Sequence, residues 1–142
     1  MTVTATPTLT RTRRVTSTLR PRVTSTPRTR VQYELLTRSL ANDPSQTRFS
    51  GLIVDRNGNP VDGIHVRATC YDFMTISYPS GTDGQTGWYD IFIDHRPKPC
   101  SWQLTIVETA DRQTVQAELS QPITIEVTDD ASLVRVDWRK NW

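Results

Sequence analysis

From residue 31 onward, apolar and polar side chains alternate with a period of two, and this alternation limits what the chain can fold into. In IHVRATC (64–70), Ile64, Val66, Ala68 and Cys70 fall on one face and polar residues fall on the other. Successive side chains of an extended strand point to opposite faces, so a period of two is typical of a strand with one buried face. The segment is therefore predicted to be a half-buried strand.

The same alternation recurs in short segments that turn residues separate about every ten positions. The predicted strands are 31–36, 49–55, 64–70, 73–78, 88–93, 101–108, 123–128 and 132–138. No stretch has a sustained helical period, although RSLANDP (38–44) has room for one helical turn. Seven or eight short strands of this kind predict an all-β fold, an antiparallel Greek-key β-sandwich over residues 31–142.

Residues 1–30 have a different composition, dominated by Thr and Arg. Residues 2–30 contain eleven Thr and three Pro, and RVTSTLRP (14–21) is followed directly by the similar RVTSTPRT (22–29). Such a low-complexity segment has almost nothing apolar to bury, so we expect a disordered, extended linker. The alternative is an arginine arm that binds phosphates or acidic polymers, although the segment has no aromatic residue to stack on nucleic-acid bases.

The net charge of +2 hides an uneven distribution. Residues 1–30 carry seven Arg and no acidic residue, whereas residues 31–142 carry ten Lys or Arg against fifteen Asp or Glu. The folded part is therefore mildly acidic, and we expect it to have no nucleic-acid partner. No run of eighteen apolar residues occurs, so the sequence predicts no membrane span.

The stretch VDRNGNPVDGIHV concentrates oxygen-bearing side chains, with Asp55, Asn57 and Asn59 at the alternate positions that a calcium loop requires. Such a loop also needs Gly at its sixth position and Glu at its twelfth, where this chain has Pro60 and Val66. The pair Asn57-Gly58 is instead a strong signal for a two-residue hairpin turn, because both residue types tolerate positive φ. The stretch is therefore predicted to be a turn and to bind no metal.

The same stretch is part of a longer pattern. FSGLIVDRNGNPVDGIHVRA (49–68), GQTGWYDIFI (84–93) and WQLTIVE (102–108) resemble the carboxypeptidase regulatory-like domains, small transthyretin-like or immunoglobulin-like sandwiches of secreted bacterial proteins. The motif positions are Gly51, Val54 (one residue later than usual), Asp55, Gly58, Pro60, Val61, Gly63 and Val66, then Thr82 or Thr86, Gly87 and Tyr89. The Thr/Pro-rich segment and the ending VDWRKNW also resemble surface proteins of filamentous bacteria of the Chloroflexi type. The resemblance implies a transthyretin-like fold, no catalysis, no cofactor, and an accessory, spacer or binding role.

The two histidines are weak candidates for catalysis. His65 is expected on the polar face of its strand and His95 in a loop, and neither belongs to a recognisable nucleophile motif. A zinc site that combines them with Cys70 and Cys100 has no support, because the spacings contain no C-x2-C or H-x3-H pair. His65 and Cys70 also fall on opposite faces of one strand. We expect surface histidines, no catalytic residue and no metal.

The two cysteines matter more as a pair. Cys70 is predicted to face the core and Cys100 to open a strand, with 29 residues between them. In an exported protein the two are candidates for a disulfide. Two independent thiols, with Cys70 buried and inert, are the alternative.

Aromatic residues supply the last candidate site. In WYDIFI (88–93) the family pattern places Tyr89 inward, which turns Trp88 and Phe92 outward. Exposed aromatic rings beside polar groups are a common way to stack on sugar rings, so Trp88, Phe92 and Asp83 of the polar loop 79–87 form a candidate glycan site. The alternative is that both rings pack under that loop or against the first strand.

These observations favour a non-catalytic extracellular or cell-surface accessory module that spaces, stabilises or presents a partner. The expected partners are other protein domains or a surface polymer, and a carbohydrate-binding module is the alternative. No apolar segment of a secretory signal follows Met1, so export requires a start further upstream or an unconventional route. Retention inside the cell is the competing interpretation.

Overall fold

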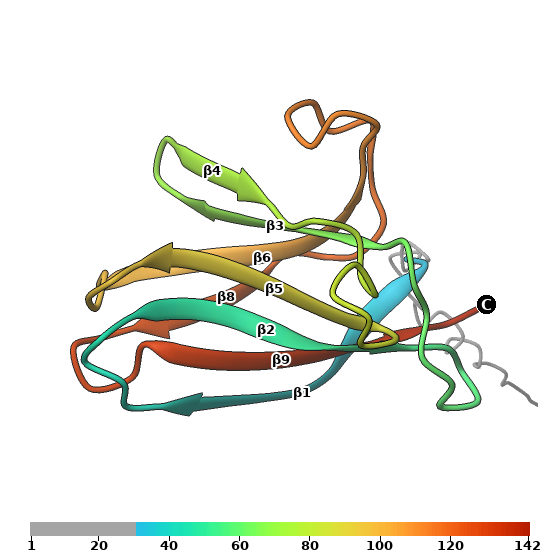
Figure 1. Cartoon of the computed structure of the whole chain (residues 1–142). Helices are drawn as coiled ribbons and strands as arrows, with labels where there is room; N and C mark the ends of the chain where they lie inside the picture. The colour runs from blue at the N-terminus through green and yellow to red at the C-terminus, as the bar shows by residue number, and fades with distance from the viewer. Residues whose placement is uncertain (1–30) are drawn as a thin grey trace, which may run out of the picture. The chain divides into compact units, whose positions relative to one another are not determined.

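A computed structural model describes residues 31–142, which form two β-sheets packed face to face (Figure 1). The linker predicted for residues 1–30 lies outside the described residues. The first sheet contains, in spatial order, β1 (Tyr33–Ala41), β9 (Leu133–Lys140), β2 (Thr47–Val54) and β5 (Trp88–Asp94). The second contains β4 (Phe73–Ile76), β3 (His65–Cys70) and β6 (Cys100–Glu108), with β7 (Ala117–Glu118) and β8 (Ile123–Val127) both pairing with β6. The all-β sandwich is therefore confirmed.

Each of the eight predicted strands has a counterpart, and the two-residue β7 is the strand that the sequence did not indicate. The helical turn considered for 38–44 is wrong, because β1 continues to Ala41. The strand persists there because it pairs with β9 along its length, from Tyr33 opposite Lys140 to Ala41 opposite Leu133.

One strand pair departs from the antiparallel prediction. The C-terminal strand β9 lies between β1 and β2, antiparallel to β1 and parallel to β2. Its close approach to β2 requires Gly51, because a Cβ at this position would lie 1.8 Å from the backbone oxygen of Val136. The remaining ladders between the named strands are antiparallel.

The core lies between the sheets and uses the inward half of each alternating strand. Tyr89 is fully buried, as its predicted orientation requires, and its hydroxyl donates a hydrogen bond of 2.8 Å to the backbone oxygen of Val136. The indole N–H of Trp138 lies 3.4 Å from the same hydroxyl. Burial raises the pKa of Tyr89 well above its usual value. The largest fully buried side chains are Trp138, Tyr33, Tyr89, Phe49 and Ile53.

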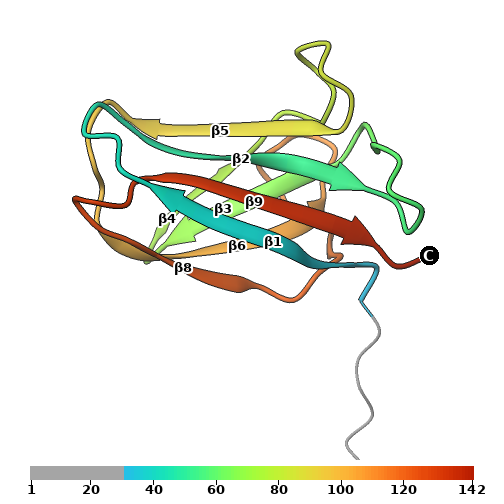
Figure 2. The same ribbon diagram turned by 90° about the horizontal axis from the view of Figure 1, so that it is seen from below.

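The strands give the sandwich two ends with different loops (Figures 1 and 2). At the proximal end, the chain enters β1 and leaves β9, and the Asn141 N–H donates to the Gln32 oxygen over 2.7 Å. The Asn141 side-chain amide donates to the Val31 oxygen over 3.0 Å. The distal end carries the turn between β3 and β4 and the loop 95–99 between β5 and β6. The two ends of the folded body therefore meet at one end of the sandwich.

Candidate functional site

The oxygen-rich stretch after β2 is a turn that satisfies its own backbone. One Asp55 carboxylate oxygen accepts the N–H groups of Asn57, at 2.8 Å, and Asn59, at 2.9 Å. These backbone hydrogen bonds, the one from Asn59 first, lower the pKa of Asp55. Gly58 has a φ of 88°, the conformation for which the Asn-Gly signal selects. The turn closes on one antiparallel bridge, Val54 opposite Pro60, and has a positive φ at Gly58 but not at Asn57. It leads from β2 in one sheet to β3 in the other, so a two-residue hairpin between paired strands is wrong.

The loop 79–87 is fastened to this turn by hydrogen bonds. An Asp62 oxygen accepts the Gly87 N–H at 2.6 Å. The buried Ser80 hydroxyl accepts the Ile64 N–H at 3.0 Å and donates to the Val61 oxygen at 2.7 Å. The loop is thereby a fixed part of the proximal end, and Asp83 lies exposed at its surface.

The structure places Trp88 and Phe92 on one face of β5, as the alternation predicts, and this face points outward, as the family resemblance implies. Trp88 is half-buried, and the guanidinium of Arg135 lies 5.3 Å from its ring centroid. Arg135 is itself held by Asp137, at 3.1 Å. Arg135 therefore covers one face of the Trp88 ring, and less of this ring is exposed than of Phe92.

Phe92 is the more accessible ring, with 44% of its surface exposed. The His95 ring lies 4.7 Å from it, and the guanidinium of Arg48 lies 5.9 Å from its centroid. Arg48 binds Asp90 through two hydrogen bonds of 2.6 Å each. The hydrogen bond to Asp90 raises the pKa of Arg48, and the charge of Asp83 adds to this effect. Arg48 is thus near the Phe92 ring and feels the charge of Asp83.

The histidines have separate surroundings. His65 is half-buried rather than fully solvated, because its Nδ1 lies 2.9 Å from the backbone oxygen of Ser77. His95 is exposed and packs against Phe92. Within residues 31–142, no group of three His, Cys, Asp or Glu side chains is placed to hold a metal ion.

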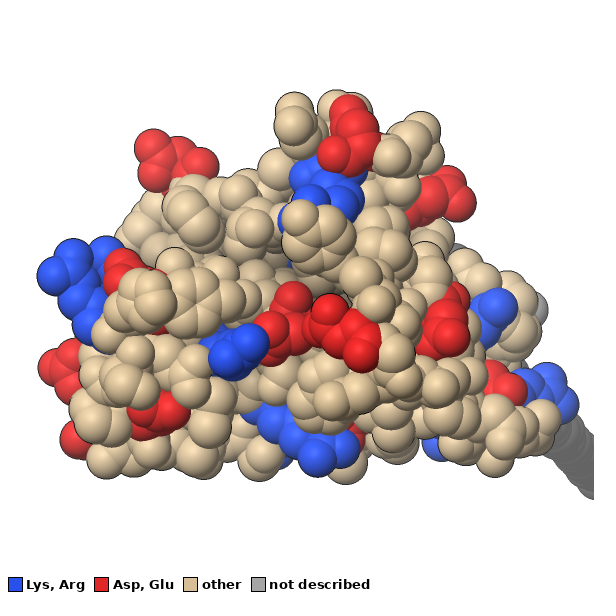
Figure 3. Space-filling model, viewed as in Figure 1, with Lys and Arg blue, Asp and Glu red and all other residues tan. Residues whose placement is uncertain are grey.

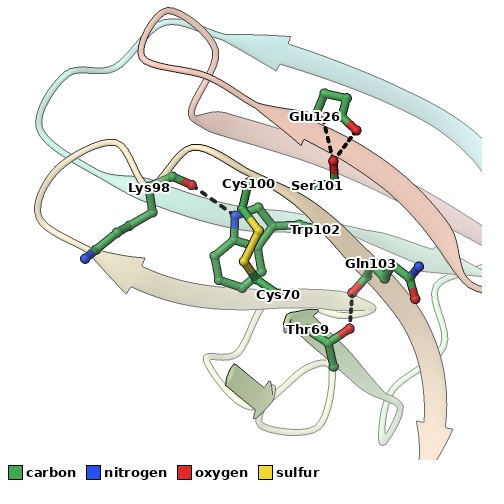
Figure 4. The surroundings of a disulfide bond; sticks show 8 residues. All are labelled: Thr69, Cys70, Lys98, Cys100, Ser101, Trp102, Gln103 and Glu126. Atoms are coloured by element: carbon green, nitrogen blue, oxygen red, sulfur yellow. Dashed lines mark hydrogen bonds between the residues drawn. A yellow bond between two sulfur atoms is a disulfide. The ribbon is translucent and has the colours of Figure 1, made fainter. Parts of the chain in front are cut away.

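Cys70 and Cys100 form a disulfide that joins β3 to β6, with 6.4 Å between their Cα atoms (Figure 4). The bond uses both cysteines of the chain, so neither is a thiol ligand. Trp102 lies beside the bond, and its indole N–H donates to the Lys98 oxygen over 3.1 Å (Figure 4). The predicted disulfide is therefore confirmed, and the alternative of two independent thiols is wrong.

Beside the disulfide, a hollow of about 300 Å³ opens between β4 and β5 at the distal end. Its lining is mostly apolar and comprises Cys70, Phe73, Ile93, Asp94, Lys98, Pro99, Cys100 and Trp102. Phe73 is 48% exposed and meets Trp102 edge to face, with 5.7 Å between the ring centroids. This hollow was not predicted from the sequence, although Phe73 follows Cys70 by three residues.

A second hollow of about 240 Å³ lies between the same two strands, nearer the proximal end. It is lined by Thr75, Ile76, Ser77, Tyr78, Asp90, Ile91, Phe92 and Arg112. The guanidinium of Arg112 stacks over Tyr78, 3.6 Å from the ring centroid, and donates to the oxygens of Ile76 and Ser77 at 3.1 and 3.3 Å. We call the two hollows together the edge groove, because β4 and β5 are edge strands of the two sheets.

Comparison with models of known protein families and with curated protein sequences finds no match. The resemblance to the carboxypeptidase regulatory-like domains therefore rests on its motif residues alone. Among residues 31–142, no helix has the length and apolar composition that crossing a membrane requires.

Proposed function

We propose that the chain is a non-catalytic accessory module that spaces, stabilises or presents a partner at the cell surface or outside the cell. The observation that carries the proposal is the architecture of the folded body. Near its two ends, Val31 and Asn141 are hydrogen-bonded to each other at the proximal end, so a partner joined to either end would lie at the proximal end and leave the distal end free. A body of this shape suits the presentation of its distal surface.

The placement of the motif residues supports the resemblance to the carboxypeptidase regulatory-like domains. Gly51 permits the contact between β2 and β9, and Gly58 and Gly63 have φ values of 88° and 84° in the turn between sheets. Gly87 sits where a Cβ would approach Pro60 at 2.7 Å. The motif thus encodes turns and close approaches, which is the chemistry of a scaffold.

The disulfide supports an extracellular location, since such bonds persist in oxidising compartments. A fractionation experiment tests this part of the proposal. The full chain, expressed in its native host, is expected in the culture medium or on the cell surface with Cys70 and Cys100 oxidised. Recovery of the chain from the reducing cytoplasm with two free thiols would contradict it.

An activity panel tests the non-catalytic part. Incubation of the full chain with generic ester, peptide and glycoside substrates is expected to give no turnover above that of buffer. Hydrolysis that disappears in His95→Ala would overturn the proposal, because His95 is the exposed histidine.

A second candidate function is carbohydrate binding, and the exposure of Phe92 favours it. Its original form uses Trp88, Phe92 and Asp83 on the outward face of β5. Loss of polysaccharide binding in Trp88→Ala would support this form.

A further inference from the structure

We propose that the edge groove binds a neutral glycan chain, which stacks on Phe92 and Tyr78 and runs between β4 and β5. This inference rests on the second candidate function and moves the binding site from the outward face of β5 into the groove.

The aromatic rings of the groove are placed along its length. Phe73 lines the distal hollow, and Phe92 and Tyr78 line the proximal one. Phe92 keeps 44% and Tyr78 60% of its surface exposed, although both flank a hollow. Phe73 and Tyr78 are five residues apart in an almost extended segment, which spans about 16 Å. Apolar ring faces at intervals along a groove of this length suit the apolar faces of successive sugar rings.

The edge of β5 adds hydrogen-bonding groups to the same wall. The Trp88 oxygen accepts the Gly81 N–H, so the backbone groups of Trp88 face away from β2. Strand alternation gives Asp90 and Phe92 the same orientation, and β2 is the strand with which β5 pairs among the described residues. Their backbone donors and acceptors therefore face the groove and are available to hydroxyl groups.

The charges of the groove favour a neutral ligand. Asp90 is paired with Arg48 at 2.6 Å, and Asp94 with Lys98 at 3.2 Å. Arg112 donates to two backbone oxygens. Figure 3 shows acidic side chains gathered along β5, below the hollow between the two sheets. Arg112, which bonds to backbone oxygens, adds one positive charge beside these two ion pairs. A neutral polyhydroxyl chain can bond to both members of each ion pair.

The wall above Phe92 is built by a strained residue. Arg112 has a φ of 62°, an uncommon conformation for a residue other than Gly, Asn or Asp. The loop that holds it is fixed by Asp111, which accepts the N–H groups of Gln113 and Thr114 at 2.8 and 2.7 Å. The hydrogen bonds of Arg112 to the Ile76 and Ser77 oxygens hold its guanidinium against one face of the Tyr78 ring, so that a ligand would use the other face.

The experiment is a depletion assay with the full chain and insoluble cellulose, xylan and mannan, with alginate gel as the anionic polymer. At least one neutral polymer is expected to bind the wild-type chain. Tyr78→Ala and Phe92→Ala are each expected to weaken that binding about threefold to tenfold, through lost ring contacts. Tyr78→Phe and Phe92→Tyr, which keep the rings, should retain it.

Trp88→Ala is the matched control, because it removes an aromatic ring of β5 that lies outside the groove. It should bind like the wild type. Urea unfolding of each variant shows whether the fold is intact, and both groove rings are exposed enough to be removed without unfolding the chain.

Three outcomes would overturn the inference. Binding that depends on Trp88 and not on Tyr78 would return the site to the outward face of β5 and leave the second candidate function standing. Binding to alginate alone would contradict the neutral ligand. Absence of binding to every polymer would reject glycan binding and leave the accessory-module proposal in place.

Discussion

Both ends of the sandwich have side-chain hydrogen bonds to loop backbone, as between Thr47 and the loop 95–99 at the distal end, but the distal end adds the disulfide. At the proximal end, Asp55, Asp62 and Ser80 are bonded to the backbone of the turns around them. At the distal end, the disulfide and the contact between Phe73 and Trp102 join β3, β4 and β6. The polar loop at the proximal end has a structural role, because its side-chain oxygens are hydrogen-bonded to backbone groups of the neighbouring turns. The distal end also has the mostly apolar hollow beside the disulfide.

Removal of the disulfide should have the largest effect on stability. Cys70→Ser with Cys100→Ser is expected to lower the free energy of unfolding by about 3–4 kcal/mol, because the unfolded chain regains the freedom of the closed loop. Urea unfolding with and without reductant measures this. The wild type in reductant should match the variant, and a variant as stable as the oxidised wild type would contradict the prediction.

Amide hydrogen exchange distinguishes the two ends of the sandwich residue by residue. Reduction of the disulfide should raise amide exchange in β4 and in the loop 95–99, where the bond and the neighbouring ring contacts act. The turn 55–63 should keep its protection, because hydrogen bonds hold it. Equal loss of protection at both ends would mean that the two ends are one cooperative unit.

A substitution at the proximal end should have a smaller effect. Ser80→Ala removes the hydroxyl that bonds the Ile64 N–H and the Val61 oxygen, and is expected to lower the free energy of unfolding by about 1–3 kcal/mol. Thr86→Ala in the same loop is exposed and serves as the control, with a change within about 0.5 kcal/mol. Equal effects of the two variants in urea unfolding would contradict the role of Ser80.

The stability of the proximal loop that contains Asp111 should depend on pH in the acid range. Backbone hydrogen bonds from Thr114 and Gln113 lower the pKa of Asp111 to about 2. A depressed pKa in the folded state contributes stability at neutral pH that is lost as the pH falls from about 4 to about 2. Asp111→Asn should therefore flatten the decline of the urea midpoint over this range. A decline as steep as that of the wild type would contradict this assignment.

The smallest expected effect is a gain in the free energy of unfolding from a substitution in the turn between β3 and β4. Tyr71 is 96% exposed and has a φ of 53°, so its side chain gives little packing in return for a strained backbone. Tyr71→Asn, which tolerates this conformation, should raise the free energy of unfolding by about 0.5–1 kcal/mol. A loss of stability in urea unfolding would show that the exposed ring makes stabilising contacts.

Much of the fold was predictable because the signals are local. The alternation in residues 88–93 put Tyr89 on one face of its strand, the family resemblance turned that face inward, and the Asn-Gly pair predicted the turn after β2. The pairing of Cys70 with Cys100 stayed an alternative, because spacing alone does not show whether two residues approach each other. Of the candidate site only Phe92 was predicted, because the family resemblance turns its face of the strand outward. Its partner Arg112 lies 34 residues from Tyr78 in the sequence, and no local pattern connects the two.

Local sequence patterns indicated where the strands lie and which side chains of each strand share a face, because both follow from the conformation of a few neighbouring residues. Only the tertiary structure decided that β9 enters between β1 and β2 and that the edges of β4 and β5 border one groove. The physical reason is that strand order depends on backbone hydrogen bonds between distant segments, such as Phe49 beside Val134, and on the burial of the whole core at once.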